Sequence, residues 1–260
     1  MQIESSSHRH WPDVVEEFPD LAPTYDAMSK NLDAMRENTK QYYRWMAAAM
    51  KPWLGKRTME VGAGPGLLTA FMSDFDYYLI TETWAPYLAD LRRIAGGRPG
   101  VEIRDLDVGD LNAKRSEFRS LQLDSIFSTN MLEHIKDDVA VLRDMGGAVG
   151  PGRRVVNLVP AYRYLYGDSD RVIGHFRRYE PAELRAKMEL AGLIVERIIP
   201  FNQAGVFSWL LINKVLRRQN ASDDQYALFD RFVPFFRLWE NVVRLPVGLS
   251  LIGVGRTPGP

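Results

Sequence analysis

A glycine-rich segment that begins at residue 60 has the spacing that most clearly points to chemistry. Glu60 closes a short apolar run and is followed by Gly62, Gly64 and Gly66. Glycines in such a turn permit positive φ and let a ligand lie directly against the backbone. Loops of this kind bind several classes of ligand, so the glycines alone do not choose among them.

Two residues of this segment separate the ligand classes. Leu67 stands where the dinucleotide fingerprint has Gly or Ala for close packing of helix on strand. Glu60 places a carboxylate near the position where a dinucleotide would bring its pyrophosphate, and the two negative charges repel each other. S-adenosylmethionine instead presents an ammonium and a sulfonium group, which a carboxylate attracts. The segment therefore favours S-adenosylmethionine over NAD.

Two more carboxylates follow at the ends of predicted strands. Glu82 lies 82 − 60 = 22 residues after Glu60, close to the ~20-residue spacing at which an acidic residue reaches the ribose hydroxyls. Asp107, at the end of the third predicted strand, is expected to accept a hydrogen bond from the adenine amine. Each carboxylate taken singly is also compatible with a solvated strand end. Three carboxylates at the carboxyl ends of three predicted strands together indicate a cofactor crevice.

Short apolar segments alternate with helical ones along most of the chain, which predicts an α/β fold with a parallel sheet covered by helices on both faces. We expect strands at 57–61, 76–82, 101–108, 123–130, 153–160, 193–201 and 250–257, and helices at 67–75, 87–96, 137–149 and 181–192. The predicted organisation is an N-terminal helical cap (1–50), a core (51–203 and 245–260) and a helical insertion or lid (204–244).

The predicted insertion carries an aromatic stripe that has two interpretations. At helical spacing such a stripe is either part of the core or the lining of a large apolar pocket under a lid. Its members are Phe207, Trp209, Phe229, Phe232, Phe235, Phe236 and Trp239.

The composition of the chain limits the classes of partner and the cellular compartment that we expect. The 260 residues include no cysteine, and 33 Lys and Arg balance 33 Asp and Glu. We therefore expect no disulfide or thiolate metal site, and no nucleic-acid partner. The first residues contain no apolar core of a signal peptide, and the longest apolar run is far shorter than the ~20 residues of a membrane span. The expectation is a soluble, cytoplasmic protein without stable membrane insertion and without a bound metal.

Three longer segments carry a family resemblance. EVGAGPG (60–66) is similar to the first motif, and STNMLEHIKDD (128–138) to the fourth-strand segment, of the class I S-adenosylmethionine-dependent methyltransferases. The stretch 158–193 resembles a bacterial small-molecule subset that has a Gly-His-x-Arg-Arg-Tyr segment after strand five, here 174–179. The resemblance implies a Rossmann-like, seven-stranded sheet with its last strand antiparallel, and methyl transfer from S-adenosylmethionine.

The predicted site has a cofactor side and an acceptor side. The predicted cofactor-binding residues are Glu60, Gly62, Ala63, Gly64, Gly66, Glu82, Thr83, Asp107, Val108 and Asn130. The candidate catalytic residues are His175 and His134, since imidazole titrates near neutrality and suits a general base. Each histidine has a structural alternative: His175 as a loop anchor and His134 as a hydrogen-bonded structural residue. The predicted acceptor-binding residues are Tyr164, Tyr166, Arg177, Arg178 and Tyr179.

These residues predict methyl transfer to a small or medium, largely apolar metabolite, with oxygen favoured as the methylated atom. Two alternatives stay open. The chain could bind S-adenosylmethionine without transferring methyl, as a scaffold or as a catalyst of another reaction, or it could be a nicotinamide-dependent oxidoreductase. The sequence does not fix the oligomeric state, and a homodimer is compatible with it.

Overall fold

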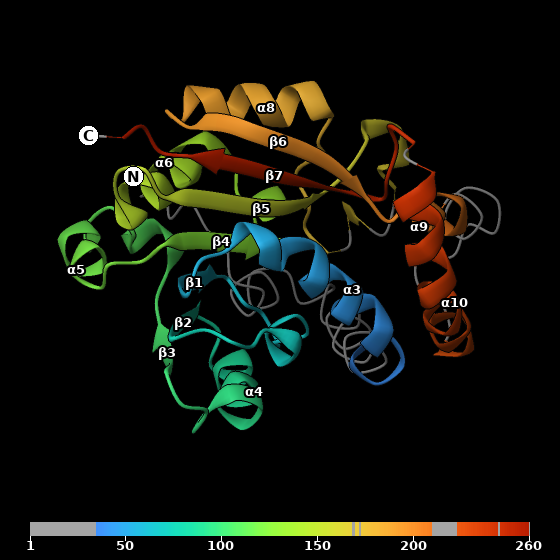
Figure 1. Ribbon diagram of the computed structural model, residues 1–260, viewed down its shortest axis with the longest axis horizontal. Coiled ribbons are helices and arrows are strands. Elements are labelled where there is room, and N and C mark those ends of the chain that lie inside the picture. The colour runs from blue at the N-terminus through green and yellow to red at the C-terminus, as the bar shows by residue number, and fades with distance from the viewer. Residues whose placement is uncertain (1–34, 168–169, 172, 210–222, 244, 260) are drawn as a thin grey trace, which may run out of the picture.

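A single seven-stranded sheet organises the protein in this computed structural model, which describes residues 35–167, 170–171, 173–209, 223–243 and 245–259. The strands are β1 (Arg57–Val61), β2 (Tyr77–Glu82), β3 (Val101–Asp105), β4 (Ser125–Thr129), β5 (Arg154–Pro160), β6 (Ile194–Phe201) and β7 (Ser250–Arg256). Their order is β3-β2-β1-β4-β5-β7-β6, with β7 antiparallel to both neighbours and all other pairs parallel (Figure 1). The predicted fold class is confirmed, including the antiparallel last strand.

Helices cover both faces of the sheet because the strands bury side chains on both. One face packs against α5 (Arg115–Ser120), α6 (Asp138–Val149) and α8 (Pro181–Leu190). The other packs against α3 (Lys40–Met50), α4 (Ala85–Ala95) and α10 (Asp223–Val242). The chain reverses its direction of progress across the sheet between β1 and β4, so the crevice for a ligand lies at the carboxyl ends of these two strands.

The helix predicted at 67–75 is wrong. Only a three-residue turn, η3 (Thr69–Phe71), follows the glycine loop, and Met72 is already extended. The guanidinium of Arg98 donates to the carbonyl oxygens of Thr69 and Met72, and the Thr69 hydroxyl donates to Glu60. The contacts of Arg98 engage carbonyl oxygens that a continuing helix would bond to its own amides, and the contact of Thr69 ties the segment to β1.

Other boundaries differ by a few residues. β3 ends at Asp105, so Asp107 lies in the turn beyond the strand rather than at its end. Helix α5 was not expected, since its six residues are too few to show a clear apolar period.

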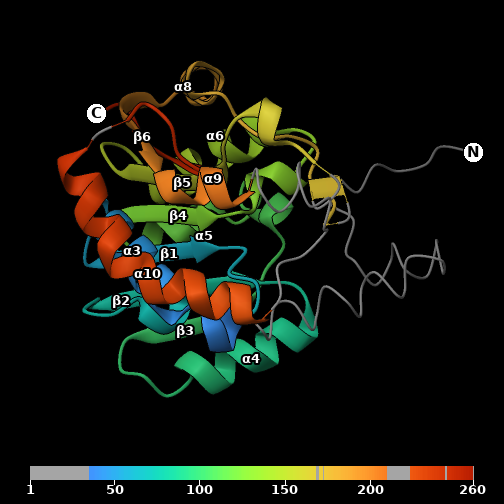
Figure 2. The ribbon, with the colours of Figure 1, turned by 90° about the vertical axis from the view of Figure 1, so that its right-hand side faces the viewer.

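The predicted insertion is partly outside the described residues, as are residues 1–34 of the predicted cap. The described part contains α9 (Gln203–Trp209) and α10, and α10 runs across α3 (Figure 2). The aromatic stripe divides: Phe229 and Phe236 pack against the hydrophobic cluster on the sheet face that α3 and α4 cover, while Phe232, Phe235 and Trp239 are exposed. None of the described helices combines the length and apolar character of a membrane span.

Helix α3 takes its N-terminal cap from α10. No side chain at its own N-cap, Thr39, bonds the first turn. The Asp230 carboxylate instead accepts from the backbone amides of Gln41 and Tyr42 at 3.0 and 2.8 Å. A carboxylate at this end also complements the helix dipole.

Replacing Asp230, which caps α3 from α10, should weaken the packing of α10 on α3. We expect Asp230→Ala to lower the free energy of unfolding by about 1–2 kcal/mol, because two amides of the first turn lose their acceptor. Asp224→Ala, which removes an exposed carboxylate from the same helix, is the matched control and should change it by less than about 0.5 kcal/mol. Urea denaturation measures both, and equal stability of the two variants would contradict the assignment of the cap.

Candidate functional site

The glycine loop after β1 leaves open space at one position. Gly62, Gly64 and Gly66 have φ of +65°, +57° and +77°, a region that glycine enters without strain. A Cβ added at Gly62 would lie 2.8 Å from Met131, and one at Gly66 2.9 Å from Leu91. A Cβ at Gly64 would have no atom of the described residues within 4 Å. Gly64 therefore presents bare backbone to open space, as a ligand contact requires.

Glu82 stands beside this loop at the carboxyl end of β2. Its carboxylate accepts from the backbone amide of Gly64 at 2.8 Å and from those of Thr83 and Trp84 at 2.8 and 3.0 Å. The side chain is half-buried. Three amide donors hold the carboxylate in one orientation, and Oε2, which accepts from the Gly64 amide, can accept one further bond. This arrangement fits the predicted ribose contact.

Glu60 lies beneath the loop rather than on its ligand-facing side. The residue is 1% exposed, and one oxygen accepts from the hydroxyls of Thr69, at 2.8 Å, and Tyr78. Burial raises the pKa of this carboxyl from 4.5 to about 7, against the opposing effect of those two hydroxyls. Its other oxygen, Oε1, has no hydrogen-bond partner among the described residues. The carboxyl can favour a cation above it through its charge, but it makes no exposed contact surface.

The remaining predicted cofactor residues border the same edge of the sheet. Asp107 caps the turn that contains Val108, because its carboxylate accepts from the Gly109 amide at 2.7 Å. Asn130, directly after β4, is exposed and has φ of +48°. Ala63 and Thr83 are half-buried beside the glycine loop and Glu82. Their contacts with a cofactor stay predictions.

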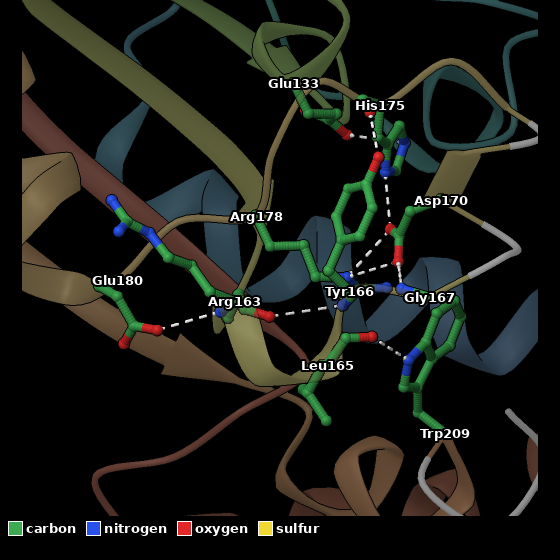
Figure 3. Close-up of polar contacts among 11 residues, drawn as sticks. Glu133, Arg163, Leu165, Tyr166, Gly167, Asp170, His175, Arg178, Glu180 and Trp209 are labelled. Carbon is green, nitrogen blue, oxygen red and sulfur yellow. Dashed lines mark hydrogen bonds and ion pairs between the residues drawn. The ribbon is translucent and has the colours of Figure 1, made fainter. Parts of the chain in front are cut away.

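The loop after β5 is built around the buried carboxylate of Asp170 (Figure 3). It accepts from the Gly167 amide at 2.9 Å, from Nδ1 of His175 at 2.8 Å and from Nε of Arg178 at 2.9 Å. Burial opposes the charge, but the hydrogen bond from His175 and the Arg178 guanidinium keep the pKa of Asp170 below its ordinary value. The guanidinium also lies 4.3 Å from the ring of Trp209 in α9.

Three of the predicted acceptor-binding residues make structural contacts that hold the loop after β5 in place. Arg178 and Tyr179 are 3% and 0% exposed, which leaves them no surface for an acceptor. Arg177 donates to the carbonyl oxygens of Ile135 and Lys136 and pairs with Asp138 at 2.7 Å. Tyr179 donates to the same carboxylate at 2.8 Å. Arg177 and Tyr179 hold the loop against α6 through Asp138, and Arg178 holds it through Asp170. A contact of the half-buried Arg177 with an acceptor stays a prediction.

The two remaining predicted acceptor residues differ. Tyr166 is half-buried and donates to the carbonyl oxygen of His175 at 2.8 Å. Tyr164 is 54% exposed and can form part of a pocket wall.

His134 and His175 come together although 41 residues separate them in sequence, and Glu133 joins them. Their rings lie edge to face with centroids 4.6 Å apart. The His175 side chain is 8% exposed, with Nε2 3.7 Å from Oε1 of Glu133, whereas His134 is exposed. Figure 3 shows the His175 ring between Glu133 and Asp170. Of the two histidines, only His134 is open to an acceptor.

Glu133 was missed in the sequence analysis, although it stands in the Leu132-Glu133-His134 segment that was singled out. It is fully buried, and neither carboxylate oxygen has a hydrogen-bond partner among the described residues. Burial raises the pKa of this carboxyl from 4.5 to about 7, although His175 opposes the shift. Glu133, His134 and His175 offer ligand atoms within 4.8 Å of one another, an arrangement that can hold a metal ion.

Comparisons with known proteins point the same way as this geometry. No family model matches the chain. It is 27% identical over 211 residues to a ubiquinone biosynthesis O-methyltransferase of Xanthomonas axonopodis pv. citri, covering 74% of this chain and 84% of the relative. A relative of the same name from Xanthomonas euvesicatoria pv. vesicatoria is 28% identical over 159 residues, covering 55% of this chain and 65% of the relative.

Two solved structures share the fold. An S-adenosylmethionine-dependent methyltransferase from Thermotoga maritima superposes with a TM-score of 0.59 at 12% identity, covering 91% of this chain and 99% of that one. The [4+2]-cyclase SpnF superposes with a TM-score of 0.53 at 14% identity, covering 84% and 81%. Relatives and structures together indicate a class I S-adenosylmethionine-dependent methyltransferase.

The structure adds a physical argument that favours S-adenosylmethionine over a dinucleotide at this loop. A pyrophosphate needs the N-terminus of a helix after the glycine loop, and only the three-residue turn η3 follows it here. The buried Glu60 adds negative charge beneath the loop when it is ionised. The open space at Gly64 and the oriented Glu82 carboxylate fit the cofactor that the relatives imply.

Removing the charge of Glu82 should weaken the cofactor without unfolding the chain. We expect Glu82→Gln to raise the Kd of S-adenosylhomocysteine about 10- to 100-fold, because a charge-assisted hydrogen bond becomes a neutral one. Glu102→Gln changes a carboxylate on the neighbouring strand β3 and should leave the Kd unchanged. Calorimetric titration measures both, and an unchanged Kd in Glu82→Gln would move the ribose contact elsewhere.

The buried Glu60 should make stability depend on pH. A carboxyl whose pKa rises from 4.5 in the unfolded chain to about 7 when folded stabilises the fold fully below pH 4.5, and this stabilisation is lost as the pH rises toward 7. Its contribution is at most about 3 kcal/mol. Glu60→Gln should flatten this part of the profile of unfolding free energy against pH, and the exposed Glu117→Gln should not. Parallel slopes for wild type and Glu60→Gln would show that Glu60 is not the group responsible.

Proposed function

We propose that this chain is an S-adenosylmethionine-dependent O-methyltransferase whose acceptor is a small or medium, largely apolar metabolite of bacterial specialised metabolism. The observation that carries the proposal is the cluster of Glu133, His134 and His175 beside the cofactor loop. Strands β1 and β4 are adjacent and parallel, so the glycine loop and this cluster follow neighbouring strand ends. Met131 contacts both, since it abuts Gly62 and its carbonyl oxygen accepts from the His134 amide.

Methyl transfer to a hydroxyl needs little more from the protein than orientation and removal of one proton. S-adenosylmethionine supplies the reactive methyl group, and the chain must hold the acceptor oxygen in line with it. The exposed His134 is the residue that we expect to accept the hydroxyl proton. A carboxylate acceptor would need no such group, so the imidazole pair supports a hydroxyl acceptor. The names of the relatives support oxygen as the methylated atom.

Exposed aromatic side chains near this edge support an apolar acceptor. Phe176 is 57% exposed next to His175, Tyr164 is 54% exposed after β5, and Phe207 is 68% exposed in α9. Aromatic rings left open to water at the carboxyl ends of the strands favour a partner that removes them from water. We also propose, on segment 174–179, that the chain is one of the bacterial small-molecule methyltransferases with a Gly-His-x-Arg-Arg-Tyr segment.

Two alternatives make different demands on the site. SpnF, named a cyclase, shows that this fold is not restricted to methyl transfer. A chain that only binds S-adenosylmethionine has no use for a proton-accepting cluster beside the cofactor loop. A nicotinamide-dependent oxidoreductase would need a pyrophosphate site, which η3 does not provide.

A change at His134 should lower the rate of methyl transfer, whereas a change at Arg177, which holds the loop against α6, should lower stability. With methyl-labelled S-adenosylmethionine and a panel of apolar phenols, we expect His134→Ala to lower single-turnover methyl transfer ~10²–10⁴-fold while the Kd of S-adenosylhomocysteine stays unchanged. Arg177→Ala should instead lower the melting temperature, because Asp138 loses a cation. Absence of methyl transfer to any hydroxyl acceptor, with cofactor binding intact, would favour the non-methylating alternative.

A further inference from the structure

We propose that Glu133, His134 and His175 form a binding site for one divalent metal ion of the zinc type, with an open position directed to the acceptor. One ligand atom from each residue lies within 4.8 Å of the others. Two imidazoles and one carboxylate with a free fourth position are a ligand set that zinc adopts at catalytic sites. No residue of the set comes from the glycine loop, so the metal site would be separate from the cofactor contacts.

The strongest observation is the state of the Glu133 carboxyl group. It is fully buried, and both oxygens lack a hydrogen-bond partner among the described residues. A buried polar group without a partner costs free energy, and folds avoid this at almost every buried position. The Nε2 of His175 is 3.7 Å from Oε1, which is too far for a hydrogen bond. A cation between these two atoms would give the carboxylate the partner that it lacks.

His175 is already oriented as a metal ligand. Its Nδ1 lies 2.8 Å from the Asp170 carboxylate, which fixes the ring and leaves the lone pair of Nε2 directed toward Glu133. A histidine that binds a metal through one nitrogen generally donates the other N–H to a carboxylate or carbonyl group. Asp170 is held in turn by Arg178 and the Gly167 amide. The ring therefore has little freedom to turn away.

His134 supplies the third ligand from the exposed side. It ends η5 (Leu132–His134), which places it next to Glu133 in sequence and edge to face with His175 in space. Because His134 is exposed whereas Glu133 and His175 are enclosed, a metal ion held by all three has its free position on the side of His134. A water molecule or an acceptor hydroxyl can occupy that position.

The role of this ion in catalysis rests on the proposed function, although its binding does not. With the ion bound, His134 serves as a ligand instead of a proton acceptor, and an acceptor hydroxyl bound to the ion would have a lowered pKa and would lose its proton to solvent water. The resulting oxygen anion attacks the methyl carbon of S-adenosylmethionine. The new O–C bond forms from an oxygen lone pair, and the electron pair of the broken C–S bond returns to sulfur, which leaves S-adenosylhomocysteine.

Metal binding can be tested without any acceptor. The full chain, stripped with a chelator, is titrated with Co²⁺ while its visible d–d absorption is recorded, and with Zn²⁺ by competition. We expect one equivalent bound, a spectrum typical of tetrahedral coordination and a higher melting temperature with metal. Glu133→Gln and His175→Ala should each weaken the affinity at least 10-fold. The double change His8→Ala and His10→Ala, which removes the other two histidines, should leave it unchanged.

The possible outcomes separate this proposal from the proposed function. No binding at micromolar Co²⁺ or Zn²⁺ by the folded wild type overturns the metal site, as does unchanged affinity in Glu133→Gln. Because Glu133→Gln keeps the size of the side chain, it is the variant that decides if His175→Ala fails to fold. Methyl transfer by the stripped enzyme at the full rate would leave the O-methyltransferase assignment intact and would remove the metal from its mechanism. Metal binding without methyl transfer to any hydroxyl acceptor would support the site and contradict the proposed function.

Discussion

Three donors converge on the buried carboxylate of Asp170, and the loop after β5 depends on this interaction. The Gly167 amide, the His175 ring and the Arg178 guanidinium approach it from different parts of the loop. A buried carboxylate with several charge-assisted partners is stable, but removal of one partner leaves an uncompensated charge and typically costs about 3–5 kcal/mol. The position of His175, and with it the whole imidazole cluster, follows from this charge balance.

A second carboxylate, Asp138 at the start of α6, repeats the arrangement on the other side of the loop. Arg177, Tyr179 and Lys187 all contact it. The segment 174–179 therefore alternates between the two carboxylates: His175 and Arg178 contact Asp170, and Arg177 and Tyr179 contact Asp138. This alternation gives the charged and aromatic residues of the segment a structural role that is independent of any acceptor. Trp209, over Arg178, extends the same framework to α9.

The sequence predicts the sheet well because a buried strand must be apolar whatever surrounds it, as RTMEV and SLIGVGR show. It also identifies the glycine loop and Glu82, whose backbone requirements are local. The sequence does not predict which distant residues an arginine side chain contacts in the folded protein. Arg98 bonds carbonyl oxygens of the segment in which a helix was expected after Gly66, and Arg178 is buried instead of exposed. The burial of Glu133 was not predicted, because nothing in a polar segment indicates that one of its acidic residues is buried.

Two unusual carboxyl groups border the point where the sheet reverses its strand order. Glu60 lies on β1 and Glu133 follows β4, and these neighbouring strands define the crevice. Both are fully buried, both have oxygens without a partner among the described residues, and burial raises both pKa values to about 7. Hydrophobic side chains at these positions would stabilise the fold more. A cation above either carboxyl reverses this, since it lowers the pKa and turns a destabilising group into a binding group. The sulfonium and ammonium of the cofactor suit the first carboxyl, and a metal ion suits the second. On this reasoning the destabilisation of the folded chain and the proposed binding of two cationic ligands have the same physical origin.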